Sequence, residues 1–290
     1  MRILVFGKNG QVAQALQLES ITEGTLTALG RLEADLLTPG NAEAAIHDHK
    51  PDIVINASAY TAVDKAEEET SAAQQLNTYA PTEMAKTAQK IGAQFIHLST
   101  DYVFDGVSKD RLAEDTPANP LNQYGATKLA GEKAVMSAHP GAVIIRTSWV
   151  FSSFGNNFVK TMLRLAEQRD SLSIVADQIG GPTEAGDIAR GILAIAAKKN
   201  RGAPGVGIYH FQGNPPVSWA EFAATIFEMA DKNVSVTSIP TAEYKTPAVR
   251  PLNTILDCAK IERDFGVAQP DWRSALVRVI KELQSKEANS

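Results

Sequence analysis

The chain begins with a short apolar run that leads into a glycine turn, Arg2-Ile3-Leu4-Val5-Phe6-Gly7-Lys8-Asn9-Gly10-Gln11-Val12-Ala13. The glycines and the alanine have G-x-x-G-x-x-A spacing, which is typical of a strand-to-helix turn whose N–H groups approach a pyrophosphate. The spacing departs from G-x-G-x-x-G, so an ordinary strand-to-helix turn stays open as an alternative. The run predicts the start of a dinucleotide-binding fold.

Outward from this turn, β-branched runs alternate with helical stretches, as in a parallel sheet with crossover helices. The predicted strands are 2–6, 25–29, 52–57, 94–98 and 142–147, and the predicted helices are 11–20, 42–49, 66–91 and 122–138. Right-handed crossovers would join them into an α/β, Rossmann-type doubly wound parallel sheet.

After Trp149 the alternation loosens, which predicts a smaller mixed α/β C-terminal substrate lobe. Helices are expected at 158–169, 219–231 and 272–286, with a strand at 172–175. Because 187–198 and 207–211 again suggest a helix and then a strand, the chain is expected to return to the sheet. We therefore assign 1–150, with 184–212, to the dinucleotide-binding domain, and 151–183 with 213–290 to the substrate domain.

The composition is that of an ordinary globular protein, with 290 residues, 44% hydrophobic and 21% charged. A formal charge of -5 and no dense basic cluster exclude nucleic acid as an expected partner. No apolar segment is long enough to cross a bilayer, and Ile3 to Phe6 is too short for a signal-peptide core. We expect no membrane association and a cytoplasmic location. The single cysteine, Cys258, cannot form an internal disulfide.

The end of the second strand distinguishes the nicotinamide cofactors, since an acid there binds the ribose 2′-OH and a cation accepts a 2′-phosphate. Gly30 and Arg31 place a cation and no acid at that point, which favours NADPH, with NADH also open. An exposed surface arginine is the alternative. Asp35 is a candidate for the adenine amino group or a solvated loop residue. Asn56-Ala57-Ser58-Ala59-Tyr60 follows a strand where ligands of such folds bind.

Tyr124 and Lys128 are four residues apart, so on a helix they share a face and can both approach one ligand. A phenol next to an ammonium is expected to have a lowered pKa, which makes Tyr124 a candidate acid for a carbonyl that is being reduced. The spacing is common by chance. It gains weight because Ser99 and Thr100 end the preceding strand, where their hydroxyls can bond a carbonyl or the phenol.

Asp101 has no single role from sequence, since it can orient a sugar or cap the loop. His47 and His49 face different directions on one helix, and no zinc or calcium spacing is present, so no metal site is predicted.

Several motifs together carry a family likeness, and they extend over nearly the whole chain. They are Gly7-Lys8-Asn9-Gly10-Gln11-Val12, the run from Asn56 to Glu67, Ser99-Thr100-Asp101-Tyr102-Val103-Phe104-Asp105-Gly106, Tyr124-Gly125 through Glu132, and Arg146-Thr147-Ser148-Trp149-Val150-Phe151. With these motifs the chain resembles the extended short-chain dehydrogenases/reductases. Within that family the resemblance implies reduction of the C4 ketone of dTDP-4-dehydro-β-L-rhamnose to dTDP-β-L-rhamnose, with a dTDP-sugar as substrate.

The resemblance implies that Tyr124 is the catalytic acid, Lys128 holds the nicotinamide ribose and Thr100 completes the triad. The cofactor-binding candidates are Gly7, Gly10, Gln11, Val12, Arg31, Asp35, Leu36, Ala57, Ala59, Tyr60, Thr61, Tyr124 and Lys128. The substrate-binding candidates are Thr100, Asp101, Trp149, Asn156, Asn157 and Arg250, the last for phosphate or alternatively for a surface ion pair.

Two alternative functions stay open. The β subunit of methionine adenosyltransferase is similar to the same family, so a non-catalytic nucleotide-binding regulatory subunit is one. Epimerisation or dehydration of another nucleotide sugar is the second. The oligomeric state is also left open, and a homodimer is one of the expectations. Some relatives need Mg²⁺ for assembly, but the sequence does not support a Mg²⁺ site, because Ala15 and Gly186 stand where acids would meet.

Overall fold

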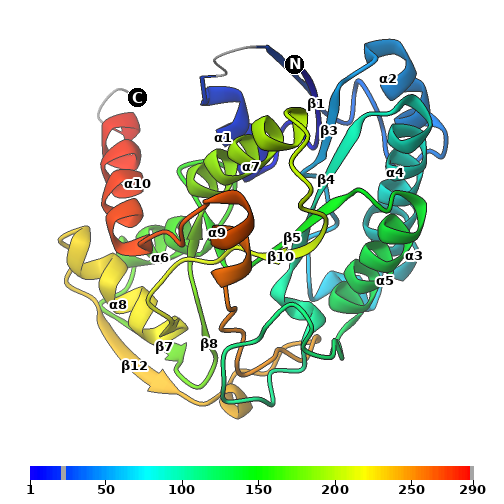
Figure 1. Cartoon of the computed structure of the whole chain (residues 1–290). Helices are drawn as coiled ribbons and strands as arrows, with labels where there is room; N and C mark the ends of the chain where they lie inside the picture. The colour runs from blue at the N-terminus through cyan, green and yellow to red at the C-terminus, as the bar shows by residue number, and fades with distance from the viewer. Residues whose placement is uncertain (21–23, 288–290) are drawn as a thin grey trace.

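The computed structural model describes residues 1–20 and 24–287. Its centre is a six-stranded sheet in the order β10-β5-β4-β3-β1-β2, and every neighbouring pair is parallel (Figure 1). The strands are β1 (Arg2–Phe6), β2 (Thr25–Leu29), β3 (Ile53–Asn56), β4 (Gln94–Thr100), β5 (Val143–Thr147) and β10 (Gly207–His210). The doubly wound α/β fold is confirmed.

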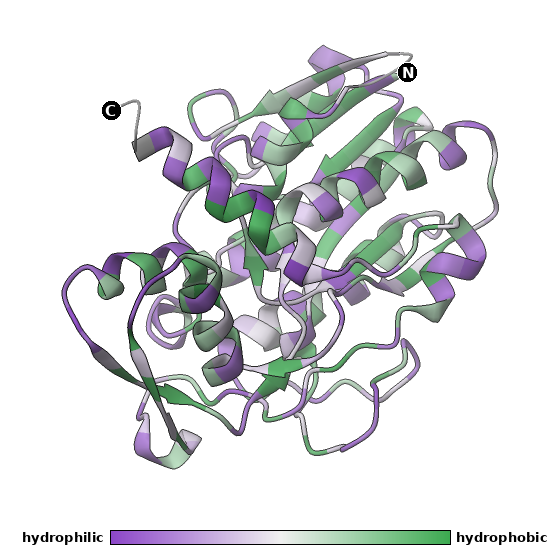
Figure 2. Ribbon diagram, turned by 90° about the vertical axis from the view of Figure 1, so that its left-hand side faces the viewer, coloured by the Kyte–Doolittle hydropathy of each residue, from purple (hydrophilic) through white to green (hydrophobic). Residues whose placement is uncertain are grey.

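Helices cover both faces of this sheet, because its strands are apolar on both sides. One face packs against α1 (Gln11–Leu18) and α7 (Ala185–Asn200). The other packs against α2 (Asn41–His49), α4 (Ala80–Ile91) and α5 (Gln123–Ala138). The strands are largely hydrophobic in Figure 2 and the outer turns of the helices largely polar. Ligands of such folds bind at the carboxyl ends of the strands.

The helix predicted over 66–91 is in fact several pieces. They are the 3₁₀ turn η1 (Lys65–Glu67), α3 (Thr70–Gln74), the π-helical turn η2 (Gln75–Tyr79) and α4. Pro81, near the start of α4, has no N–H for the helical ladder, and the wider π turn precedes it. The π turn places Asn77 so that its side chain bonds Tyr60 and Thr127, at 2.9 and 3.1 Å. The interruption therefore supports the end of β3 and helix α5.

A separate apolar cluster forms the C-terminal lobe around Phe222 and Trp272. Its elements are α6 (Phe158–Ala166), β7 (Ser171–Val175), α8 (Trp219–Met229), β12 (Ser235–Ile239) and α10 (Trp272–Glu287) (Figure 1). Strands β7 and β12 pair in parallel. The sequence did not reveal β12, because three of its five residues are short and polar, namely Ser235, Thr237 and Ser238. No helix in the described part of the chain is long and apolar enough to span a membrane.

Short elements join the lobe to the sheet. They are η3 (Asp101–Val103), β6 (Val150–Phe151), β8 (Ile179–Gly180), β9 (Thr183–Glu184), β11 (Val217–Ser218), η4 (Thr241–Glu243) and α9 (Ala259–Phe265). Helix α7 packs on the sheet and β10 pairs with β5, after which the chain enters the lobe. Leu256, Cys258, Ile261, Phe265 and Val267 later pack on the same face of the sheet.

Candidate active site

A cavity of about 590 Å³ lies at the carboxyl ends of β1, β3, β4 and β5 and reaches the start of α8. The predicted residues that line it are Gly10, Gln11, Val12, Ala57, Ala59, Thr61, Thr100, Asp101, Tyr124, Lys128, Trp149 and Asn156. The predicted residues outside its lining are Gly7, Arg31, Asp35, Leu36, Tyr60, Asn157 and Arg250. The fold thus brings residues of all five sequence motifs to one cavity.

The glycine turn fits a dinucleotide. Gly7 has a φ of +101°, and a Cβ there would lie 2.8 Å from the backbone of Ala57, so a side chain is excluded on both grounds. Helix α1 starts after Gly10 with no side-chain cap and no acid in its first turn. Its first N–H groups are therefore available to an anion, and the helix dipole favours negative charge there.

Beyond β2, the predicted adenine-side residues lie at the surface or in the core. Arg31 donates to Asp35 at 3.2 Å, and Asp35 accepts from the N–H of Leu37 at 3.1 Å. That N–H is the main cause of the lowered pKa of Asp35. Leu36 is buried, and its carbonyl accepts from Gln75 at 3.0 Å.

The predicted triad converges at the edge of the cavity. The side chain of Asn122 accepts from the N–H of Gly125 at 2.8 Å and so starts α5. Gly125 lets the helix approach β4, because a Cβ there would lie 2.1 Å from the carbonyl oxygen of Tyr102. Tyr124 is thereby held within hydrogen-bonding reach of the Thr100 hydroxyl. Lys128 is buried one turn later, and its Nζ donates to the carbonyl of Leu98 at 2.6 Å.

The electrostatics of Tyr124 differ from the expectation that Lys128 would lower its pKa. Burial raises the pKa of Tyr124 to about 12, and the Thr100 hydroxyl acts in the opposite direction. Burial also lowers the pKa of Lys128 to about 8, opposed by the carboxylate of Glu132. Desolvation is the largest cause of both pKa shifts, because both groups are withdrawn from water. The phenol consequently keeps its proton at neutral pH.

Asp101 is buried next to the triad, and its Oδ1 accepts from the Thr100 hydroxyl at 3.0 Å. Burial raises the pKa of Asp101 to about 7. Its Oδ2 has no hydrogen-bond partner among residues 1–20 and 24–287. A buried carboxyl oxygen of this kind is suited to a ligand hydroxyl.

Comparison with known proteins places this geometry in a family. Residues 1–285 match the family described as RmlD substrate binding domain. The dTDP-4-dehydrorhamnose reductase of Sinorhizobium fredii is 43% identical over 286 residues, which cover 97% of each chain. The chain belongs to the RmlD family, that of the dTDP-4-dehydrorhamnose reductases.

Solved structures of the same family agree with the model. A dTDP-4-dehydrorhamnose reductase from Clostridium acetobutylicum superposes with a TM-score of 0.92 at 36% identity, covering 98% of this chain and 100% of that one. The enzyme from Bacillus anthracis, solved in complex with NADP, has a TM-score of 0.90 at 35% identity, with 97% and 99% covered. Both relatives share the sheet and the lobe over essentially their full length.

In this member of the RmlD family, a buried polar network supports the triad, and the sequence did not reveal it. Glu132 accepts from Ser99 at 2.5 Å and pairs with Arg146 at 2.9 and 2.7 Å. Both charged side chains are at most 3% exposed. The two residues lie on α5 and β5, so only the fold brings them together. A sequence signal was the presence of Glu132 one helical turn after Lys128.

The lobe contributes two more features to the cavity. Trp149, with a φ of +46°, stacks on Trp219 with ring centroids 3.5 Å apart. Trp219 lines the cavity and was not anticipated, because it begins a helix 70 residues later in the chain. The other feature is the joint at Gln11, a pair of hydrogen bonds that connects the start of α1 to the start of the lobe. The Oε1 of Gln11 accepts from the side chains of Ser152 at 2.7 Å and Asn157 at 2.9 Å.

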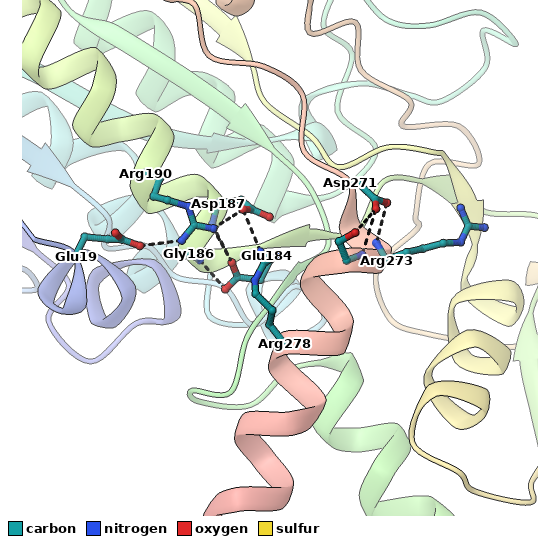
Figure 3. Close-up of polar contacts among 9 residues, drawn as sticks. Glu19, Glu184, Gly186, Asp187, Arg190, Asp271, Arg273 and Arg278 are labelled. Atoms are coloured by element: carbon teal, nitrogen blue, oxygen red, sulfur yellow. Dashed lines mark hydrogen bonds and ion pairs between the residues drawn. The ribbon is translucent and has the colours of Figure 1, made fainter.

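In this RmlD-family chain, the surroundings of Ala15 and Gly186 are the place where the acids of a metal site would meet. Within the described residues, no three His, Cys, Asp or Glu side chains are grouped to hold an ion. Ala15 is buried in the core. Nearby, Glu19 and Glu184 approach the guanidinium of Arg190 at 2.9 and 3.7 Å, and Asp187 also pairs with it (Figure 3). The carboxylates there are balanced by an arginine.

Proposed function

We propose that this protein reduces the C4 ketone of dTDP-4-dehydro-β-L-rhamnose to dTDP-β-L-rhamnose, using NADPH. The observation that carries the proposal is the convergence of Thr100, Tyr124 and Lys128 on one cavity with the glycine turn. Relatives at about 40% identity over the full chain bear the reductase name.

In this proposal, bound NADPH supplies a hydride for the carbonyl carbon. Tyr124 holds its proton at neutral pH, because its pKa is about 12, and gives it to the carbonyl oxygen as negative charge develops. The hydroxyl of Thr100 helps to orient that oxygen. The ammonium of Lys128 bonds the nicotinamide ribose and favours transfer of the proton.

We assign the other predicted site residues to two groups, those that bind the cofactor and those that bind the sugar nucleotide. We assign Gly7, Gly10, Gln11 and Val12 to the pyrophosphate, and Ala57, Ala59, Tyr60 and Thr61 to the middle of the cofactor. Arg31, Asp35 and Leu36 are assigned to its adenosine end. Asp101, Trp149, Asn156 and Asn157 are assigned to the sugar nucleotide, with Arg250 as a phosphate candidate. These roles correspond to a dinucleotide domain of 1–150 with 184–212 and a substrate domain of 151–183 with 213–290.

The proposed location is the cytoplasm, because cofactor and substrate are charged, water-soluble molecules. A homodimer stays a prediction. Nucleic acid is not a proposed partner, given the formal charge of -5.

The test mixes purified protein with NADPH and the 4-keto sugar nucleotide and follows the absorbance of the reduced cofactor. We expect its oxidation to match the ketone supplied. Binding of nucleotide without consumption under any buffer condition would reject the proposal and favour a regulatory subunit. Oxidised cofactor retained through purification would favour an epimerase or a dehydratase, since those enzymes regenerate it in each cycle.

A further inference from the structure

An acid lies at the end of β2 although none follows that strand directly in the sequence. The side chain of Glu33 folds back, and its Oε2 accepts from the N–H of Gly30 at 2.9 Å. Its Oε1 accepts from the Nζ of Lys8 at 2.8 Å. Gly30 leaves room for this, because a Cβ there would lie 3.1 Å from Oε2. The fold thus corrects the expectation that only a cation, Arg31, occupies this point.

The ion pair lies beside the glycine turn. The N–H groups of Gly7 and Lys8 both donate to the carbonyl of Leu29, each at 3.0 Å, which fixes the turn against the end of β2. Asn9, the next residue of the turn, lines the cavity. In dinucleotide-binding folds this point receives the adenosine ribose. Lys8 and Glu33 therefore lie beside the end of β2, where this fold places the ribose, although neither side chain lines the cavity.

Both side chains are accessible to a ligand, since Lys8 is 42% and Glu33 41% exposed. An exposed ion pair of this kind is weak, so either partner can be exchanged for a ligand group at low cost. A carboxylate accepts a hydrogen bond from a hydroxyl but repels a phosphate dianion. An ammonium has the opposite preference, because it donates to phosphate and gains charge neutralisation.

We propose that Lys8 and Glu33 select the cofactor: Glu33 accepts from the ribose 2′-OH of NADH, and Lys8 leaves Glu33 to bind the 2′-phosphate of NADPH. This inference rests on the proposed function and adds to it the pair of residues that sets the cofactor preference. Arg31, which is 73% exposed and paired with Asp35, adds a second positive charge nearby. The protein can thus bind either cofactor, because the Lys8–Glu33 contact is replaced by a contact between one of these side chains and the ribose 2′ substituent.

The experiment compares Glu33→Gln and Lys8→Met with the wild type by titration calorimetry, using adenosine 2′,5′-bisphosphate and 5′-AMP. These probes differ only in the 2′-phosphate. We expect the preference for the bisphosphate to rise about tenfold in Glu33→Gln and to fall about tenfold in Lys8→Met, as one charge-assisted contact is worth. The ratio of kcat/KM for NADPH over NADH should move in the same directions.

The matched control is Glu167→Gln, which removes the exposed Lys232–Glu167 pair of the lobe, with an N–O distance of 2.6 Å. It should leave the preference unchanged. Opposite shifts in the two variants cannot come from a general loss of folded structure, because that would weaken the binding of both probes to the same extent. Equal losses for both probes, unchanged ratios, or a wild type that binds neither probe overturn the inference. Opposite shifts in a protein that leaves the ketosugar untouched uphold it while rejecting the reductase.

Discussion

The guanidinium of Arg250 forms a bidentate ion pair with the carboxylate of Asp64, with N–O distances of 3.0 and 2.8 Å. The pair joins the segment after β3 to a loop 186 residues later. Arg250 also donates to the carbonyl of Ala248 at 3.1 Å and bonds the Tyr102 side chain. These contacts use the guanidinium within the protein, although it is also a candidate for phosphate.

We expect Arg250→Met and Asp64→Asn to have the same effect, because each removes the same joint. Each should lower the free energy of unfolding by about 1–2 kcal/mol, and the double variant should be no worse than either. Thermal unfolding of the three variants and KM for the sugar nucleotide check this. A rise in KM confined to Arg250→Met would instead assign the guanidinium to a phosphate of the substrate.

Tyr124→Phe should lower kcat by about 10²–10⁴-fold, because it removes the proton donor and little else. Cofactor affinity should be nearly unchanged. Steady-state kinetics and a cofactor titration measure the two quantities. A rate close to that of the wild type would remove Tyr124 from the mechanism.

Lys128→Ala should lower both the rate and the affinity for the cofactor, because one ammonium is proposed to serve both. Single-turnover kinetics and a cofactor titration separate the two effects. Retention of either quantity would contradict the double role.

The activity should fall as pH rises through about 8, because Lys128, whose pKa is about 8, loses its charge there. Glu132→Gln should move this limb to lower pH, since the carboxylate of Glu132 is what raises the pKa of Lys128. Profiles of kcat/KM against pH give the shift. Lys133→Gln, on the exposed side of the same helix, is the control, and a limb that stays in place in Glu132→Gln would refute the assignment.

Asp101 should make stability depend on pH in an unusual direction. Its folded pKa of about 7 lies above the ordinary value of 3.8, so the native state binds the extra proton and loses stability as pH rises between these values. Relative to the wild type, Asp101→Asn should gain up to about 4 kcal/mol between pH 4 and pH 8.

Denaturant unfolding at both pH values measures this gain. Asp105→Asn is the control with the opposite sign, because the N–H of Val107 holds the pKa of Asp105 below its ordinary value. A wild-type-minus-variant difference at Asp101 that is independent of pH would contradict the burial argument.

Local patterns were enough to predict the parallel sheet and the placement of Thr100, Tyr124 and Lys128 around one cavity. The apolar runs fix the strands, and the four-residue spacing of Tyr124 and Lys128 fixes a shared helical face. The predicted direction of the pKa shift of Tyr124 was wrong, because the shift depends on burial, and burial is a property of the whole fold. Trp219 and the Glu132–Arg146 pair were not found, since their partners lie far away in the sequence. Glu33 was not found although its partner Gly30 is only three residues away, because the sequence does not show that the side chain folds back. The break of the helix at Gln75–Tyr79 had a local sign in Pro81, but its π geometry depends on Asn77 reaching two other segments.

The joint at Gln11 has a mechanical consequence. One side chain belongs to the cofactor turn, and its amide oxygen anchors Ser152 and Asn157, from which the lobe begins. Because these two hydrogen bonds join the turn to the lobe, we expect a phosphate bound at the turn to shift the first residues of the lobe as well.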